Sequence, residues 1–252
     1  MKARINALFV AAGAAVLPVI ACIAPAQQSQ AAAHASDAIR WEVTVRDSGA
    51  HAPRLRLSQR KSTSDLQLDG RRAEFGAARS ALGGAAGPVS FSVVHEAGRL
   101  DCNGRLNAAF DGAGHCRFQP DAGFARALSD RGIGTPSRDQ QLAMLMVDAT
   151  TALADGLIGE GVRPKDGSDL IAAAALGVTG AYVHELQSGA LRLTAIDDAI
   201  ACKALGVDGA YVRGLAAAGY ASLSSDEVVR LKALGVTPDY ARSMNAAARA
   251  AK

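Results

Sequence analysis

The chain has 252 residues, enough for one large domain or two modest ones. Hydrophobic residues make up 49% of it and aromatic residues only 4%, so Ala, Val and Leu must build its core. Its formal net charge of +3 comes from 27 basic and 24 acidic residues, a balance that lacks the basic excess of nucleic-acid-binding proteins.

Residues 1–26 have the pattern of a secretory signal peptide. Lys2 and Arg4 give a positive start, an apolar stretch follows, and Ala24-Pro25-Ala26 forms an A-x-A cleavage site. We therefore expect the remainder of the chain to be exported, to the periplasm or beyond the cell.

A lipoprotein signal is the alternative at this end of the chain. Val19-Ile20-Ala21-Cys22 resembles the lipobox of bacterial lipoproteins, which would leave Cys22 as a lipidated N-terminus. An uncleaved anchor is a third alternative. Each of the three places the chain outside the cytoplasm, and contact with a membrane through a lipid is expected only if Cys22 is modified.

Residues 27–38 are rich in Ala and Gln and are expected to form a flexible lead. From 39 to 119 apolar and polar residues alternate, which predicts five to seven short antiparallel strands in one sheet or a small sandwich. Trp41, the one tryptophan, falls on the core side of this alternation. A stretch rich in Gly and Ala at 76–87 separates the middle strands.

Cys102 and Cys116 are expected to face each other across a hairpin. If Leu100 pairs with Phe118, the same register places the two cysteines opposite each other, where a disulfide fits. A turn at Asp111-Gly112 would shift the register and remove that pairing. The bond would close a short loop and contribute about 3 kcal/mol.

From 120 to 252 the sequence repeats with a period of 29 residues. Ala-Leu-Gly-Val begins at Ala175, Ala204 and Ala233. A period of this length predicts a stack of units, each made of two short helices and a turn, that bury their apolar faces on one another. The frame extends back to Phe124, and it places Cys202 at a buried position of a helix. The aromatic position of the repeat holds Tyr182, Tyr211 and Tyr240, for which helix packing is favoured over a recognition surface.

Residues that favour helix ends recur at matching positions of each unit. The glycine of Leu-Gly-Val suits the left-handed residue that ends a helix, and the acidic residues at 197–198 and 226–227 suit a first helical turn. Asp148 replaces this glycine in an early unit, as is expected where a repeat array meets a different domain. Thr179, Asp208 and Thr237 are predicted to cap the helices that follow the turns.

The sequence predicts no catalytic, cofactor or metal site. His184-Glu185 would need a second histidine at the position of Ser188 to match a zinc-protease motif, so a solvent-facing helix is favoured. His95, Glu96 and His115 lie near the two cysteines but fit no standard ligand spacing.

The repeat blocks at 219–229 and 233–240, together with the hairpin at 99–120, resemble a group of bacterial exported proteins, largely uncharacterised, with a small β domain followed by helical repeats. The repeats are also similar to the extracytoplasmic tails of membrane proteins related to the β-lactam-sensor (antirepressor) metallopeptidases. This chain has neither the multiple spans nor the zinc motif of those proteins, so the resemblance implies no peptidase activity.

The sequence predicts an α+β protein: an antiparallel β domain followed by a helical-repeat array. We expect a non-enzymatic periplasmic binding or regulatory protein whose array contacts a protein or a cell-envelope component, without a cofactor and without nucleic acid. An enzyme with a site in the β domain or at its junction with the first repeat, around His95, Asp101 or His115, is the alternative from another class. A structural lipoprotein anchored at Cys22 is the third hypothesis.

Overall fold

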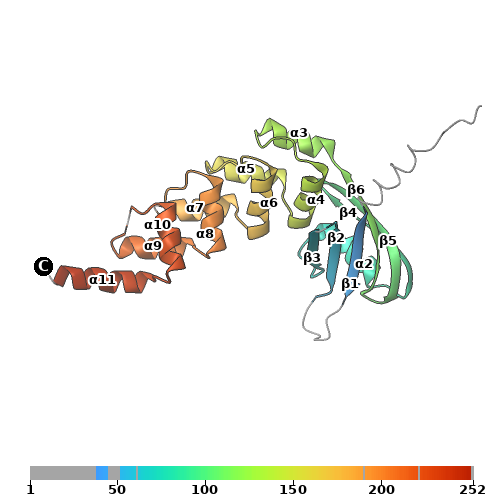
Figure 1. The fold of residues 1–252 in the computed structure, drawn as a ribbon, viewed down its shortest axis with the longest axis horizontal. Helices are drawn as coiled ribbons and strands as arrows, with labels where there is room; N and C mark the ends of the chain where they lie inside the picture. Colours follow the sequence, from blue (N-terminus) through green and yellow to red (C-terminus); the bar gives the residue numbers. More distant parts are fainter. Residues whose placement is uncertain (1–37, 45–51, 61, 190, 221, 251–252) are drawn as a thin grey trace, which may run out of the picture. The chain divides into compact units, whose positions relative to one another are not determined.

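The computed structural model describes residues 38–44, 52–60, 62–189, 191–220 and 222–250. The predicted signal peptide, Cys22 and the lead up to residue 37 lie outside the described residues. The described residues form an α+β fold, with one six-stranded antiparallel sheet followed by a series of short helices (Figure 1).

The sheet has the strand order β3-β2-β1-β6-β5-β4 and is a single sheet, not a sandwich. On β1 the residues at 39, 41 and 43 are buried and those between them are exposed, so the predicted alternation is confirmed. The strands are β1 Ile39–Thr44, β2 Arg54–Gln59, β3 Ser62–Gln67, β4 Gly87–His95, β5 Gly98–Ala108 and β6 Asp111–Pro120.

Trp41 is fully buried over a pair of glycines. A Cβ atom on Gly104 would lie 2.5 Å from the Trp41 ring, and one on Gly114 would lie 2.6 Å from it. The indole Nε1–H donates to the backbone oxygen of Asn103 at 3.0 Å, and the ring meets Phe91 edge to face at 5.6 Å. The facing glycines of β5 and β6 are therefore the space that the tryptophan needs.

The β5–β6 hairpin has the predicted register. Leu100 lies opposite Phe118, and Cys102 lies opposite Cys116, to which it is joined by a disulfide. The chain turns at residues 109–110, so Asp111 is already the first residue of β6 and does not shift the pairing.

The stretch at 76–87, expected only to separate strands, contains a helix. α2 (Gly76–Leu82) follows the short 3-10 turn Ala73–Phe75 and packs against β4. Ala78 and Leu82 of α2 are buried, four residues apart on one helix face, and Phe75 at the end of the preceding turn is buried with them. The sequence interpretation missed this helix because its small residues hide the period.

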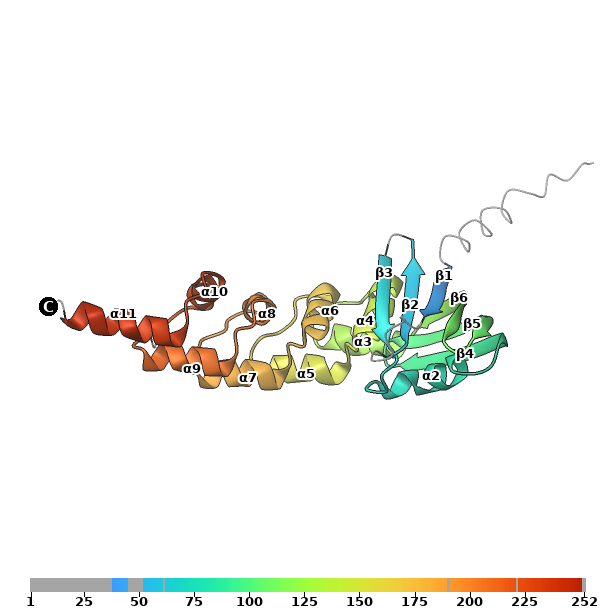
Figure 2. The same cartoon turned by 90° about the horizontal axis from the view of Figure 1, so that it is seen from below.

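Nine helices follow the sheet in the described part of the chain, and they form two rows. Figure 2 shows α5, α7 and α9 in one row and α6, α8 and α10 in the other, and each helix packs against the next of its own row. The first row is α3 Ala122–Asp130, α5 Thr151–Gly159, α7 Gly180–Ser188, α9 Gly209–Ala217 and α11 Pro238–Ala250; the second is α4 Arg138–Val147, α6 Gly167–Leu176, α8 Ile196–Ala204 and α10 Ser225–Ala233.

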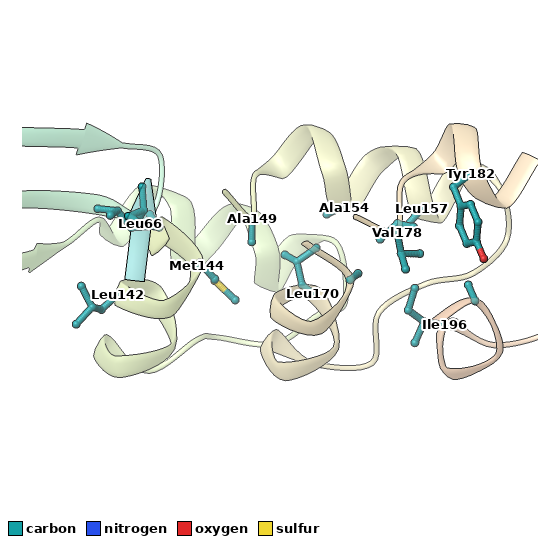
Figure 3. Packing of buried hydrophobic residues seen from close by; sticks show 14 of the residues in the cluster. Leu66, Leu142, Met144, Ala149, Ala154, Leu157, Leu170, Val178, Tyr182 and Ile196 are labelled. Atoms are coloured by element: carbon teal, nitrogen blue, oxygen red, sulfur yellow. The ribbon is translucent and has the colours of Figure 1, made fainter. Parts of the chain in front are cut away.

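Aliphatic side chains from both rows meet between them and form the core of the array (Figure 3). Met144, Leu157, Leu170, Val178 and Ile196 are all fully buried there. Since each helix has only nine or ten residues in the middle of the array, it depends on its neighbours for stability.

The predicted helix ends are confirmed. Gly177, Gly206 and Gly235 have φ angles of 71°, 68° and 73°, the left-handed conformation that ends a helix. Asp148 adopts the same conformation with φ 62°. Threonine or aspartate caps every helix of the first row by accepting a hydrogen bond from the N–H three residues on: Asp121, Thr150, Thr179, Asp208 and Thr237.

Candidate functional site

The histidines and the aspartate considered for an enzyme site do not converge. The Asp101 carboxylate accepts hydrogen bonds from the Ser92 hydroxyl and from Arg99, which hold its pKa below the usual range. His115 is exposed on the sheet face opposite Cys116. The side chain of His95 is buried, 5% exposed.

His95 instead belongs to a set of three residues that join the β domain to the first helices. Its Nε2 lies 3.3 Å from the Asp148 carboxylate, and its Nδ1 accepts from the N–H of Ala97. The Glu96 carboxylate accepts from both the N–H and the hydroxyl of Thr151, at the first residue of α5. Asp148 therefore replaces a glycine because its side chain meets the β domain.

Arg72 is the third of these residues and the one with the strongest contacts. Its Nη1 and Nη2 donate to the carbonyls of Met146 and Leu145 at 2.6 and 2.7 Å, in the last turn of α4, where carbonyls lack helical partners. Glu74 accepts from its Nε at 2.7 Å, and the guanidinium lies 4.9 Å from the centre of the Phe75 ring. Sequence reasoning missed Arg72 because its partners are more than 70 residues away.

The remaining predicted residues have structural positions. Cys202 is buried in α8, and burial raises the pKa of its thiol to about 11. His184 is an exposed residue of α7 whose Nδ1 lies 3.3 Å from the Glu160 carboxylate. In the part of the chain that the structure describes, no three His, Cys, Asp or Glu side chains are arranged to hold a metal ion.

Two of the three tyrosines join one pair of helices to the next. The hydroxyl of Tyr182 donates to the carbonyl of Val207 at 2.7 Å, and that of Tyr211 donates to the carbonyl of Val236 at 2.8 Å. A lysine ammonium lies over each ring, at 4.2 and 4.4 Å from the ring centre. The preference for packing over recognition is confirmed at these two positions, whereas Tyr240 is 56% exposed.

The array exposes a row of leucines, which we call the leucine row: Leu176, Leu205 and Leu234. Leu176 is the last residue of α6, and Leu205 and Leu234 come directly after the last residues of α8 and α10. The three lie 29 residues apart in the sequence, and their exposed fractions are 41%, 41% and 74%. An exposed alanine precedes each leucine and an exposed glycine follows it. The row is therefore a series of exposed apolar residues at the C-terminal ends of the second row of helices.

The side of α4 that carries Leu142 and Met146 faces the β domain. Leu142 and Met146 of α4 precede Ile171 and Ala175 of α6 by 29 residues, and they line one cavity together with Ile39 of the sheet. In α4 this helix side thus packs on aliphatic side chains of the β domain. The leucine row itself corresponds to Val147 in α4, which is half-buried and packs against the core, as Ile171 of α6 does.

The cavity beneath α4 has a volume of about 210 Å³. Five of its lining residues are apolar, and the others are polar residues at the end of the β2–β3 hairpin and on α4. They are Ile39, Leu57, Leu142, Ala143 and Met146, and Gln59, Arg60, Ser62, Ser64 and Asp139.

Among the described residues no single helix is long and apolar enough to cross a membrane. The helices α4 and α5 reach the required length and apolar composition only when they are counted together, and the chain bends by 81° between them.

No protein-family model, no curated protein and no solved structure matches the chain. The resemblance to exported proteins with β domains and helical repeats therefore stays a prediction.

Proposed function

We propose that the protein is a non-enzymatic, exported binding or regulatory protein, and that its helices α6, α8 and α10 dock a partner protein through the leucine row. We also propose that residues 120–252 are an array of repeats with a period of 29. Support for the period comes from the helix starts: residues 122, 151, 180, 209 and 238 in the first row, and 138, 167, 196 and 225 in the second.

The observation that carries this proposal is the exposure of a leucine that the fold does not require. Within Ala-Leu-Gly-Val, the glycine is needed for a positive φ, and the valine is buried in two copies, at Val178 and Val207. The leucine has neither role, yet it recurs three times on the surface. Contiguous exposed apolar surface is typical of interaction sites, and repeat arrays present such surfaces along their length.

The geometry of the row favours an amphipathic helix as the partner segment. Neighbouring packed helices lie about 8–10 Å apart, which sets the interval between successive leucines. A helix presents an apolar residue every seventh position, a rise of about 10.5 Å, which matches this interval.

Two observations support an extracytoplasmic location. The signal-peptide pattern of residues 1–26 is one. The Cys102–Cys116 disulfide is the other, since such bonds persist in oxidising compartments. Lipidation at Cys22 stays the alternative form of export, and a diacyl group found by mass spectrometry would establish it.

The test compares two triple variants that carry the same added charge. Leu176→Glu, Leu205→Glu and Leu234→Glu place three carboxylates in the leucine row. Ala152→Glu, Ala181→Glu and Ala210→Glu place them at exposed positions in the first turns of α5, α7 and α9, where the helix dipole tolerates them.

Each surface substitution should change stability by about 0.5 kcal/mol or less, and a carboxylate at a helix C-terminus should cost about 0.3–1 kcal/mol more. Both triple variants should therefore stay folded, and their melting temperatures check this. After cross-linking in the native host, proteins that co-purify with the wild type should also co-purify with the alanine-site variant and be lost from the leucine variant. The proposal is wrong if the leucine variant retains the same partners as the wild type.

A further inference from the structure

The cavity between the β2–β3 hairpin and α4 suggests a second site, independent of the leucine row. We infer that it binds a small uncharged molecule with a short aliphatic chain and a carbonyl or amide oxygen at one end. This goes beyond the partner binding proposed above, because it concerns another surface and another class of ligand.

The cavity exists because small polar side chains replace large apolar ones on the inner side of the hairpin. Leu55 and Leu57 face inward on β2, and Ser64 lies opposite Leu57, while Ser62 lies opposite Gln59. On a strand with one face turned to the core, apolar and polar residues alternate, and this pattern would place apolar side chains at both Ser62 and Ser64 of β3. Ala143 is the small residue that faces them from α4.

The polar end of the cavity offers a hydrogen-bond donor without a partner. The Nε2 atom of Gln59 is buried and has no hydrogen-bond partner among the described residues. Leaving a buried donor unpaired is costly, so an acceptor oxygen placed there is favoured. The hydroxyls of Ser62 and Ser64 lie in the same lining and can both donate and accept.

The charge at the mouth favours an uncharged ligand. The Asp139 carboxylate lies 3.3 Å from Arg60 Nη1 and 3.6 Å from Arg138 Nη1, so the charged groups at the mouth are already paired with one another. A carboxylate would meet Asp139 and an ammonium would meet Arg60, and both would lose hydration on entry. An amide or carbonyl oxygen satisfies the donor with a smaller desolvation cost.

The volume fixes the size of the ligand. A cavity of about 150 Å³ accepts benzene, which has six non-hydrogen atoms. The cavity here measures about 210 Å³, so a molecule of about eight non-hydrogen atoms fits. Hexanamide meets these requirements, with an aliphatic chain for Ile39, Leu57 and Met146 and an amide oxygen for Gln59.

The experiment titrates the purified protein with hexanamide and follows the methyl signals of Ile39 and Met146 by NMR. We expect saturable shifts that Ser64→Ile abolishes by filling the cavity and that Gln59→Leu weakens at least about tenfold. The matched control Ser58→Ile places the same side chain on the outer side of β2 and should bind as the wild type does.

Ala143→Leu fills the cavity from α4 and replaces Ser64→Ile if the strand variant does not fold. Hexylamine and hexanoate, with the same chain and a charged end, should bind at least about tenfold more weakly. Absence of saturable shifts with hexanamide, equal binding by the filled variants, or tighter binding of either charged probe would overturn the inference. None of these outcomes bears on the leucine row, so the two proposals fail separately.

Discussion

Arg72 should hold the first helices on the β domain, and its truncation should be among the most damaging single changes at the surface of the protein. Arg72→Ala removes two charge-assisted hydrogen bonds to the carbonyls of Leu145 and Met146. Each such bond is worth about 1.5–3 kcal/mol when water is excluded. The arginine side chain is 20% exposed, so water can reach the freed carbonyls, and we expect a loss of about 2–4 kcal/mol in the free energy of unfolding.

The neighbouring Arg71 is the matched control. Its side chain is 88% exposed and pairs with Asp69 at the surface, so Arg71→Ala should change stability by about 0.5 kcal/mol or less. Urea unfolding is followed at Trp41, which reports on the sheet alone, and by circular dichroism, which reports chiefly on the helices. The reasoning is refuted if Arg72→Ala is no less stable than Arg71→Ala. It is also refuted if Arg72→Lys is as stable as the wild type, because lysine keeps the positive charge but lacks the planar guanidinium that donates to two carbonyls at once.

Further predictions concern the array and the hairpin. Tyr182→Phe should cost about 1–2 kcal/mol in urea unfolding, because it leaves a buried carbonyl unpaired, whereas Tyr240→Phe should cost about 0.5 kcal/mol or less; equal costs would contradict the joining role of the tyrosine. Reduction of the Cys102–Cys116 bond should lower stability by about 3 kcal/mol, measured with and without reductant, and no change would mean that the bond adds nothing to the fold. Burial raises the pKa of the Cys202 thiol from 9.0 to about 11, so the folded state favours the protonated thiol and the protein loses stability as pH rises from 9 toward 11. Cys202→Ala should lose less free energy of unfolding over this pH interval. Identical pH profiles of stability for the variant and the wild type would rule out the thiol as the cause of the loss.

Features that depend on near neighbours in the sequence could be predicted. The cap at Thr179 and the left-handed Gly177 follow from residue types within a few positions of the helix ends, and the structure confirms both. The pairing of Cys102 with Cys116 followed from a strand register that runs through a short hairpin. Local chemistry was sufficient in each of these cases.

Features that depend on distant contacts could not be predicted. In the sequence nothing distinguishes Arg72 from the adjacent Arg71, and only the fold brings Arg72 to the end of α4. The cavity at Ser64 arises from the approach of a helix that lies more than 70 residues further on. The helix at 76–82 was missed for a different reason, since its alanines and glycine carry little period and its burial depends on β4.

The leucine row combines both kinds of information. The repeat of Ala-Leu-Gly-Val was evident in the sequence, but repetition alone did not distinguish a buried leucine from an exposed one. The structure shows that the valine is inside at Val178 and Val207 and that the leucines are outside. Because the leucines are exposed at a repeated position, the sequence repeat indicates a candidate interaction surface as well as a fold.

The most direct test of the central claim is site-specific photo-cross-linking in the native host. A photoreactive phenylalanine replaces Leu176, Leu205 or Leu234 in turn, and Ala210 on the other row of helices serves as the control position. We predict that all three leucine positions cross-link to one partner protein, at sites that lie in order along one helix and about seven residues apart. Adducts at Ala210 alone, adducts to unrelated proteins from each position, or none from the leucine row would contradict the account.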